Sequence, residues 1–239
     1  MAKADPLLRQ SAAPVLDVRG LTKAVPGGRV LFSGLDLAVA PGEVVAIMGE
    51  SGVGKSTLLN LIAGLDSLDG GEIAIAGAGL AALDDDARTL LRRDRIGFVF
   101  QAFHILPHLT LCQNIALPLV LAGGARTPSL ARAEAMLGKV GLGGRGGDYP
   151  AQLSGGELQR IAIARALVHG PALILADEPT GNLDPETAER ILALLLAEVK
   201  ASGAAAVIVT HSDRAAAVAD RALVLGRSGL SERAPAGGG

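Results

Sequence analysis

The sequence predicts an α/β fold in which helices cover a parallel sheet. Strand-like and helix-like segments alternate along most of the chain, which is typical of parallel strands joined by crossover helices. Four short apolar runs are each followed by a polar or glycine-rich stretch: Val44–Met48, Ile96–Phe100, Leu173–Ala176 and Ala205–Val209. Because ligands of open α/β sheets bind at the carboxyl ends of the strands, these strand ends predict one site.

The first apolar run leads into the string GESGVGKST, which precedes an apolar helix. Glycines let a backbone wrap a phosphate without Cβ clashes, and this spacing is the P-loop pattern. In that pattern Lys55 reaches the β- and γ-phosphates and Ser56 ligates Mg²⁺. A plain glycine turn is the weaker alternative, because the full pattern stands in its strand-to-helix context. We expect nine residues to bind nucleotide: Gly49, Glu50, Ser51, Gly52, Val53, Gly54, Lys55, Ser56 and Thr57.

The second apolar run follows a segment, Asp84–Arg95, that is acidic at its start and basic at its end. That polarity suits the macrodipole of a solvated helix. Gln101 follows the run, where it could touch Mg²⁺ and an attacking water. A lone glutamine after a strand is more often structural or solvated. The next region, about residues 102–167, contains prolines, apolar helical pieces and a glycine cluster, and it predicts a mostly helical insertion.

Near the end of that insertion, Ser154, Gly155, Gly156 and Glu157 precede an apolar helix. Ser-x-x-Glu is a capping box, in which both side chains satisfy free backbone N–H groups. The same helix end is an anion site, and the two glycines allow a phosphate to approach the backbone closely. Both interpretations hold together, and the following Gln159-Arg160 favours function.

The third apolar run ends in the pair Asp177-Glu178. Such a pair predicts Mg²⁺ held through water by Asp177 and a general base at Glu178. Further along, Asp184 precedes a proline, which indicates a helix N-cap and leaves a role at a subunit contact open. The fourth run is followed by His211, whose imidazole could bond a γ-phosphate oxygen, although a lone histidine is more often structural.

The bulk properties of the 239-residue chain narrow the class of protein. The net charge of −2 argues against a general nucleic-acid binder. Cys112 is the only cysteine, so no internal disulfide forms. We find no apolar run of membrane-spanning length and no signal-peptide pattern at the start, so we expect a cytosolic chain. Residues 1–14 and 231–239 are expected to be flexible tails around one domain at 15–230.

These motifs together resemble the ATPase subunit of ATP-binding cassette (ABC) transporters over about residues 15–230. The order matches: P-loop, glutamine loop at Gln101, signature at Leu153–Glu157, Walker B strand ending at Asp177-Glu178, D-loop at Asn182–Asp184 and switch histidine at His211. The resemblance implies an α/β P-loop NTPase with a RecA-like parallel core, a small antiparallel β subdomain and a helical subdomain at about 102–167.

The resemblance also implies ligands and partners. ATP and Mg²⁺ would bind at the interface of a head-to-tail homodimer or heterodimer, with Lys55 and Gln101 among the catalytic groups. The P-loop of one subunit would face Ser154–Glu157 of the other, with Asp184 also at the nucleotide. Integral-membrane permease subunits are the further implied partners, which would hold the chain on the cytoplasmic face of the membrane. No nucleic-acid partner is expected.

Finer strings are similar to the lipoprotein-release and macrolide-export cassettes: GLD at 64–66, VFQAFHILPHLT at 99–110, NIALPL at 114–119 and LADEPTGNLD at 175–184. Two positions depart from the family. Val25 stands where an aromatic residue usually stacks on adenine, so we expect weak discrimination between ATP and GTP. Gln113 stands where the subgroup usually has glutamate, at the expected permease contact.

Two other functions remain open at this point. A cassette that regulates cell division or envelope processes through a membrane partner would share every catalytic residue. A soluble cassette acting on nucleic acid or ribosomes usually has two cassettes or coiled-coil insertions, and this chain has neither. A small GTPase is excluded because no guanine-recognition motif follows the P-loop.

Overall fold

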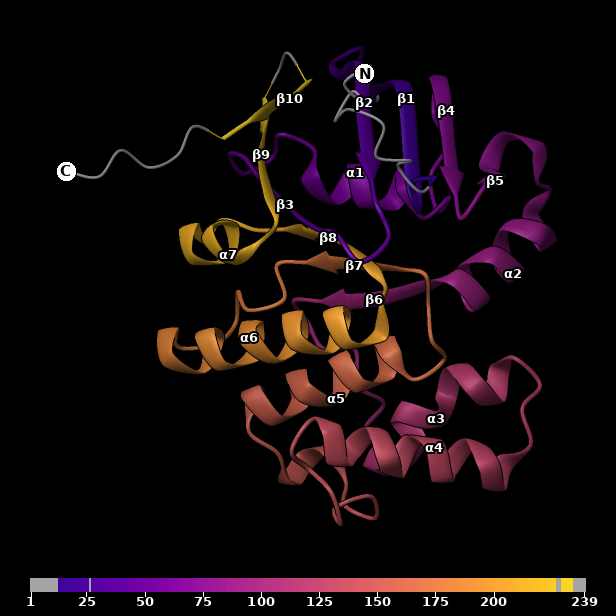
Figure 1. Cartoon of the computed structure of the whole chain (residues 1–239), viewed down its shortest axis with the longest axis vertical. Coiled ribbons are helices and arrows are strands. Elements are labelled where there is room, and N and C mark those ends of the chain that lie inside the picture. The colour runs from indigo at the N-terminus through magenta and orange to yellow at the C-terminus, as the bar shows by residue number, and fades with distance from the viewer. Residues whose placement is uncertain (1–12, 26, 227–228, 234–239) are drawn as a thin grey trace, which may run out of the picture.

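The computed structural model describes residues 13–25, 27–226 and 229–233, and a six-stranded sheet lies at its centre (Figure 1). The strand order is β10-β9-β3-β8-β7-β6, with every neighbouring pair parallel except β10 and β9. The strands are β3 (Val44–Met48), β6 (Ile96–Phe100), β7 (Leu173–Asp177), β8 (Ala205–Val209), β9 (Arg221–Gly226) and β10 (Gly229–Glu232). The four predicted strands are confirmed, and β7 is one residue longer because Asp177 still pairs with Val209.

A second, antiparallel sheet lies beside one face of the first, in the order β2-β1-β4-β5. It consists of β1 (Leu16–Ala24), β2 (Val30–Val39), β4 (Gly70–Ile75) and β5 (Ala78–Gly79), and a 3₁₀ turn at Leu80–Ala82 follows. Helix α1 (Lys55–Ile62) lies between the two sheets, and its buried leucines join residues of both sheets in one hydrophobic core. The small antiparallel subdomain implied by the family resemblance is therefore present.

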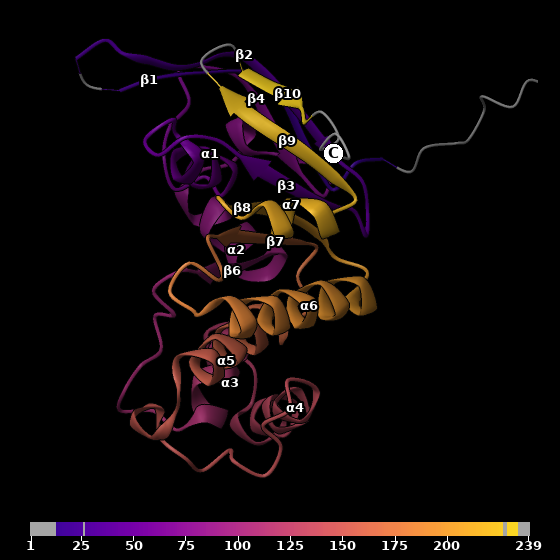
Figure 2. The same ribbon diagram turned by 90° about the vertical axis from the view of Figure 1, so that its left-hand side faces the viewer.

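The other face of the six-stranded sheet is covered by helices, and further helices extend beyond them (Figure 2). Those on the sheet are α5 (Gly155–Leu167), α6 (Pro185–Ser202) and α7 (Asp213–Val218); α2 is Asp85–Arg95, α3 is Leu111–Leu121, α4 is Arg126–Lys139, and a 3₁₀ turn spans Pro150–Gln152. Helices α3, α4 and α5 fall in the region predicted to be a helical insertion. The solvated helix predicted at 84–95 is confirmed as α2, which Asp84 caps and which buries only Leu91.

Helix α5 contributes to two cores at once. One set of its residues packs in the core between the sheet and α6: Ile163, Ala166 and Leu167. Ile161 and Ala164, together with the C-cap Val168, pack with α3 and α4. Gly97 of β6 allows the close approach, because a Cβ at that position would stand 2.2 Å from the carbonyl oxygen of Ala166. Helix α5 therefore packs against both the six-stranded sheet and the outer helices α3 and α4.

The predicted tails have different outcomes. Residues 1–12 and 234–239 lie outside the described residues. The C-terminal tail predicted from 231 was wrong at its start, because Ser231 and Glu232 complete β10 by pairing with β9. Arg233 is also held, by a bond from its Nη2 to Asp213 Oδ1 at 2.8 Å. Within the described ranges, no helix combines the length and the apolar character that crossing a membrane requires.

Candidate active site

The loop between β3 and α1 has backbone geometry that only glycine accepts easily. Gly54 caps α1 at φ 110°, and a Cβ there would stand 3.0 Å from Phe32. Gly49 has φ 156°, and a Cβ there would stand 2.6 Å from the carbonyl oxygen of Leu225. The packing around the loop thus requires the glycines that the motif supplies, and the loop ends at the positive end of α1.

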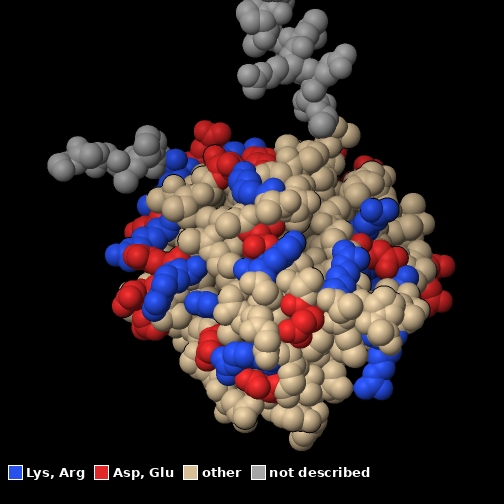
Figure 3. All heavy atoms as spheres, turned by 60° about the horizontal axis from the view of Figure 1, so that its bottom comes forward, with Lys and Arg blue, Asp and Glu red and all other residues tan. Residues whose placement is uncertain are grey.

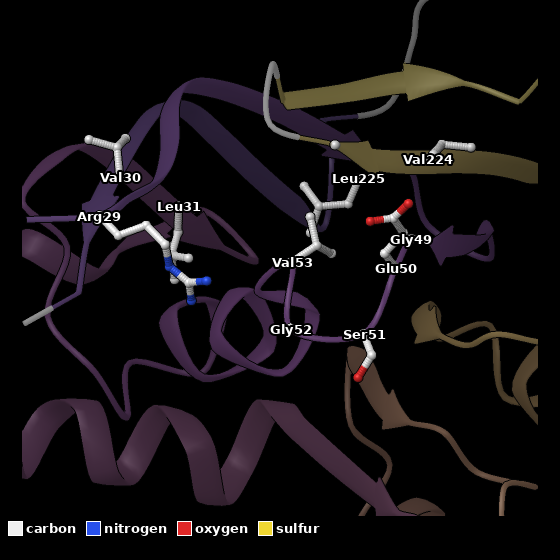
Figure 4. Close-up of a pocket in the computed structure, with 11 residues that line it drawn as sticks. Arg29, Val30, Leu31, Gly49, Glu50, Ser51, Gly52, Val53, Val224 and Leu225 are labelled. Atoms are coloured by element: carbon white, nitrogen blue, oxygen red, sulfur yellow. The ribbon is translucent and has the colours of Figure 1, made fainter.

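This loop lines two adjoining cavities. The first, of about 820 Å³, is lined by Gly49 to Val53, by Val224 to Gly226 and by Arg29 to Leu31 (Figure 4). The second, of about 300 Å³, is lined by Val25, Arg29, Leu31, Ser51, Gly52, Gly54, Lys55, Ser56, Thr57, Glu178 and His211. All nine P-loop residues predicted to bind nucleotide therefore line one cavity or both.

Three side chains predicted to be catalytic meet at the second cavity. Lys55 Nζ donates to the carbonyl oxygens of Gly49 at 2.8 Å and Glu50 at 3.0 Å, and it lies 3.1 Å from His211 Nε2. The same nitrogen of His211 lies 3.0 Å from Glu178 Oε1. Burial lowers the pKa of Lys55, and the charges of Glu178 and Asp177 oppose that shift. An ammonium, an imidazole and a carboxylate thus form one continuous polar chain.

The turn after β7 fixes Glu178 in an unusual backbone conformation. Its φ is 45°, a left-handed geometry that costs a residue with a Cβ roughly 1–2 kcal/mol. The turn is closed by two bonds, from Glu178 N to Val209 O at 2.9 Å and from Gly181 N to Glu178 O at 3.0 Å. Strain of this kind is frequent where a functional side chain must point in one direction.

Gln101 directly follows β6, and Asp177 is the last residue of the neighbouring strand β7, as the sheet pattern predicted. Gln101 bonds reciprocally with Asn182: its Nε2 donates to Asn182 Oδ1 at 3.0 Å, and Asn182 Nδ2 donates to its carbonyl oxygen at 2.9 Å. Gly181 leaves room for this pair, since a Cβ there would stand 2.8 Å from Gln101 Nε2. The side chain of Gln101 is thereby held beside the Glu178 turn.

The Ser154 helix end has the predicted capping box. Ser154 Oγ accepts from Glu157 N at 3.4 Å, and Glu157 Oε2 accepts from Ser154 N at 2.8 Å. Gly156 is packed against the start of α6, since a Cβ there would stand 2.6 Å from Thr187, and a Cβ on Gly155 would stand 3.4 Å from Leu183. Asp184 caps α6 as predicted, by accepting from Thr187 N at 3.0 Å.

Within one chain, the residues predicted to bind nucleotide therefore fall mainly into two groups, while Gln101, Asp177 and Asp184 line neither cavity. The P-loop, Glu178 and His211 share a cavity, whereas none of Ser154, Gly155, Gly156 and Glu157 lines either cavity. Four residues near these groups were not predicted as site residues: Arg29, Arg145, Gln159 and Asn182. Gln159 and Asn182 belong to the signature and D-loop segments of the sequence, but their contacts become apparent only in the folded structure.

Comparison with known proteins identifies the family. The ABC transporter family model matches residues 32–181. The lipoprotein-releasing system ATP-binding protein LolD 1 of Rhodospirillum rubrum is 50% identical over 208 residues, covering 86% of this chain and 92% of that protein. The macrolide export ATP-binding/permease protein MacB of Shigella flexneri is 44% identical over 225 residues, covering 93% of this chain but 34% of that larger protein.

A solved structure agrees with these matches. The ATP-binding cassette MJ0796, in a dimeric post-hydrolysis state bound to ADP and Pi, has a TM-score of 0.80 and 39% identity, covering 92% of this chain and 99% of its own. The chain therefore belongs to the ABC transporter family, as one of its ATP-binding and ATP-hydrolysing cassettes.

Proposed function

We propose that this cassette works as a head-to-tail dimer that hydrolyses two ATP molecules and drives a membrane permease of the lipoprotein-release or macrolide-export type. The observation that carries the proposal is the division of the site. A P-loop cavity with Lys55, Glu178 and His211 occupies one part of the chain, and the Ser154 helix end lies outside it. Two copies complete the site, and MJ0796, a relative by structure, is dimeric.

In this proposal the P-loop backbone and Lys55 hold the phosphates. Glu178 accepts a proton from the attacking water as the water oxygen bonds to the γ-phosphorus, and ADP leaves. Before nucleotide binds, His211 orients Glu178 through Nε2, which lies 3.0 Å from Glu178 Oε1. When ATP is bound, this N–H donates to a γ-phosphate oxygen instead. When nucleotide enters, Lys55 exchanges its present bonds to the loop carbonyls for phosphate oxygens.

The donor set also fits Mg²⁺. The Ser56 hydroxyl is exposed on the first turn of α1, and Asp177 ends β7 near enough to Lys55 to affect its pKa. Hydroxyl, carboxylate and amide oxygens are the hard ligands that Mg²⁺ accepts, with Gln101 as the third protein donor. The ion would neutralise charge on the phosphates.

The permease partner is supported by an apolar groove between α2, β6, α3 and α5, with a volume of about 830 Å³. Its lining includes Leu90 and Leu121, which are 48% and 67% exposed, and Arg92 and Arg93 also border it. A helical permease segment with apolar residues and a carboxylate would complement this surface. On the molecular face seen in Figure 3, basic and acidic side chains are interspersed rather than gathered into one charged field.

The catalytic part is tested with Glu178→Gln. This variant should bind ATP normally, lose about 10²- to 10⁴-fold in turnover and accumulate as a dimer with ATP. Lys55→Ala should lose both binding and turnover. Glu186→Gln, a matched change of an exposed carboxylate on α6, should behave as wild type. Near-normal turnover by Glu178→Gln would show that another group is the base.

The partner is tested by capturing tagged Glu178→Gln protein from its native membranes with ATP and Mg²⁺. We expect a permease with few spans and a large outer domain, which Leu121→Asp should fail to recover although it still dimerises. Val218→Asp, a matched change at a 56% exposed position on α7, should recover it. Recovery of a regulatory membrane protein instead would favour the cell-division or envelope role.

A further inference from the structure

Glu157 places a carboxylate in the first turn of the helix end where the proposed function puts a phosphate. Its Oε2 accepts from the backbone N of Ser154 at 2.8 Å and from the Ser154 hydroxyl at 2.9 Å. The hydroxyl has a single proton, so while it donates to Glu157 it cannot donate to another oxygen. For the Ser154 hydroxyl to donate to a phosphate oxygen, its hydrogen bond to Glu157 must break. The negative charge of Glu157 must then be compensated by another group.

Arg145, in the loop between α4 and the 3₁₀ turn at Pro150–Gln152, provides the compensating positive charge. Its Nη1 donates to Glu157 Oε1 at 2.5 Å, and its Nε donates to Asp148 Oδ2 at 2.8 Å. The side chains of Arg145 and Glu157 are 34% and 30% exposed, so solvent screens the pair only in part. The bonds from Ser154, and then those from Arg145, lower the pKa of Glu157, so it is ionised at neutral pH.

We propose that Arg145 is a positioning residue of the signature site, holding and neutralising Glu157 so that the Ser154 hydroxyl and the helix end are free to take the γ-phosphate of ATP bound to a second copy. The inference rests on the proposed function. Arg145 acts through Glu157 rather than on the phosphate, because its guanidinium already bonds two carboxylates. Without it, an uncompensated negative charge would stand beside a polyanionic ligand.

The experiment measures ATP-driven dimerisation by analytical ultracentrifugation in the Glu178→Gln background. Arg145→Gln should weaken the dimer roughly tenfold, with a smaller deficit at high salt, because an unscreened like charge would oppose the phosphates. Adding Glu157→Gln to Arg145→Gln should restore the dimer to within about twofold of the parent, because the coupled charge is gone. Asp148→Asn, the matched change of the other carboxylate on Arg145, should leave dimerisation unchanged.

Binding of a fluorescent ATP analogue to the monomer separates this role from a general defect. It should be equal in all variants, since the P-loop cavities do not include Arg145. If the double variant is as weak as Arg145→Gln, Arg145 only anchors its loop and the inference is overturned. If the Glu178→Gln parent itself fails to dimerise with ATP, the proposed function fails, and this result is distinct from the first.

Discussion

Gln159 connects α5, the helix that begins at the signature residues, to the turn that contains Glu178. Its side chain is completely buried in α5, and its Nε2 donates to the carbonyl oxygen of Pro179 at 2.6 Å. Its Oε1 has no partner among the described residues. A buried hydrogen bond from Gln159 therefore holds Pro179, the residue after the proposed base Glu178. Only one of the two polar atoms of the Gln159 amide has a hydrogen-bond partner among the described residues.

These contacts give a magnitude for Gln159→Met. The change leaves the Pro179 carbonyl unpaired, at about 1–3 kcal/mol, but it also removes the buried, unpaired Oε1, whose penalty is of similar size. We expect a net change in the free energy of unfolding of about 1 kcal/mol or less. Gln159→Ala should be about 2–5 kcal/mol less stable than the methionine variant, because it leaves a cavity.

Catalysis should respond differently from stability. Without the bond, the turn holding Glu178 at φ 45° loses one of its fixed points, and a small misplacement of a catalytic group costs up to about 10²-fold in rate. Chemical denaturation and steady-state ATPase assays should show Gln159→Met with near-normal stability and at least about tenfold lower turnover. A methionine variant with full turnover but a stability loss above about 3 kcal/mol would refute this reasoning.

Three further perturbations have distinct readouts. Gly97→Ala should cost at least about 1–3 kcal/mol in a denaturation experiment, because its Cβ would clash with the Ala166 carbonyl and push α5 from the sheet; unchanged stability would contradict this. Burial lowers the pKa of His169 in the folded protein. As the pH falls, the unfolded chain therefore binds a proton at this imidazole more readily than the folded chain does. Wild type should therefore lose thermal stability as the pH falls from about 7 to 5, and His169→Gln should flatten that slope. Val25→Tyr, on the cavity wall, should tighten ATP binding by about 1–3 kcal/mol and raise ATP-over-GTP preference in competition binding, whereas strong ATP preference in the wild type would contradict the role of Val25.

The strand-end residues could be predicted from sequence because their placement follows from local patterns. Apolar runs that form parallel strands bring Gln101 and Asp177 to the same edge of the sheet, whatever the rest of the chain does. Helix caps such as Asp184 are equally local, since the capping carboxylate and the Thr187 N–H that donates to it lie three residues apart. These parts of the site depend on neighbours in sequence or on one rule of topology.

The remainder depends on packing between distant segments. The hydrogen bond from Gln159 to Pro179 joins residues 20 apart, and the pair of Gln101 with Asn182 joins residues 81 apart. No periodic pattern in the sequence predicts contacts between residues so far apart. The end of β10 was missed because Ser231 and Glu232 are polar, and they join the sheet through backbone pairing alone. The antiparallel sheet was expected only from the family resemblance.

Helix α5 packs in two hydrophobic cores, and this arrangement affects how the protein unfolds. A helix whose opposite faces belong to two cores cannot be released from one without exposing the other. The helical layer is therefore not an independent folding unit, and amide protons in the middle of α5 should exchange only when the whole molecule opens. Denaturation would then be a single cooperative event rather than a loss of the outer helices followed by the sheet.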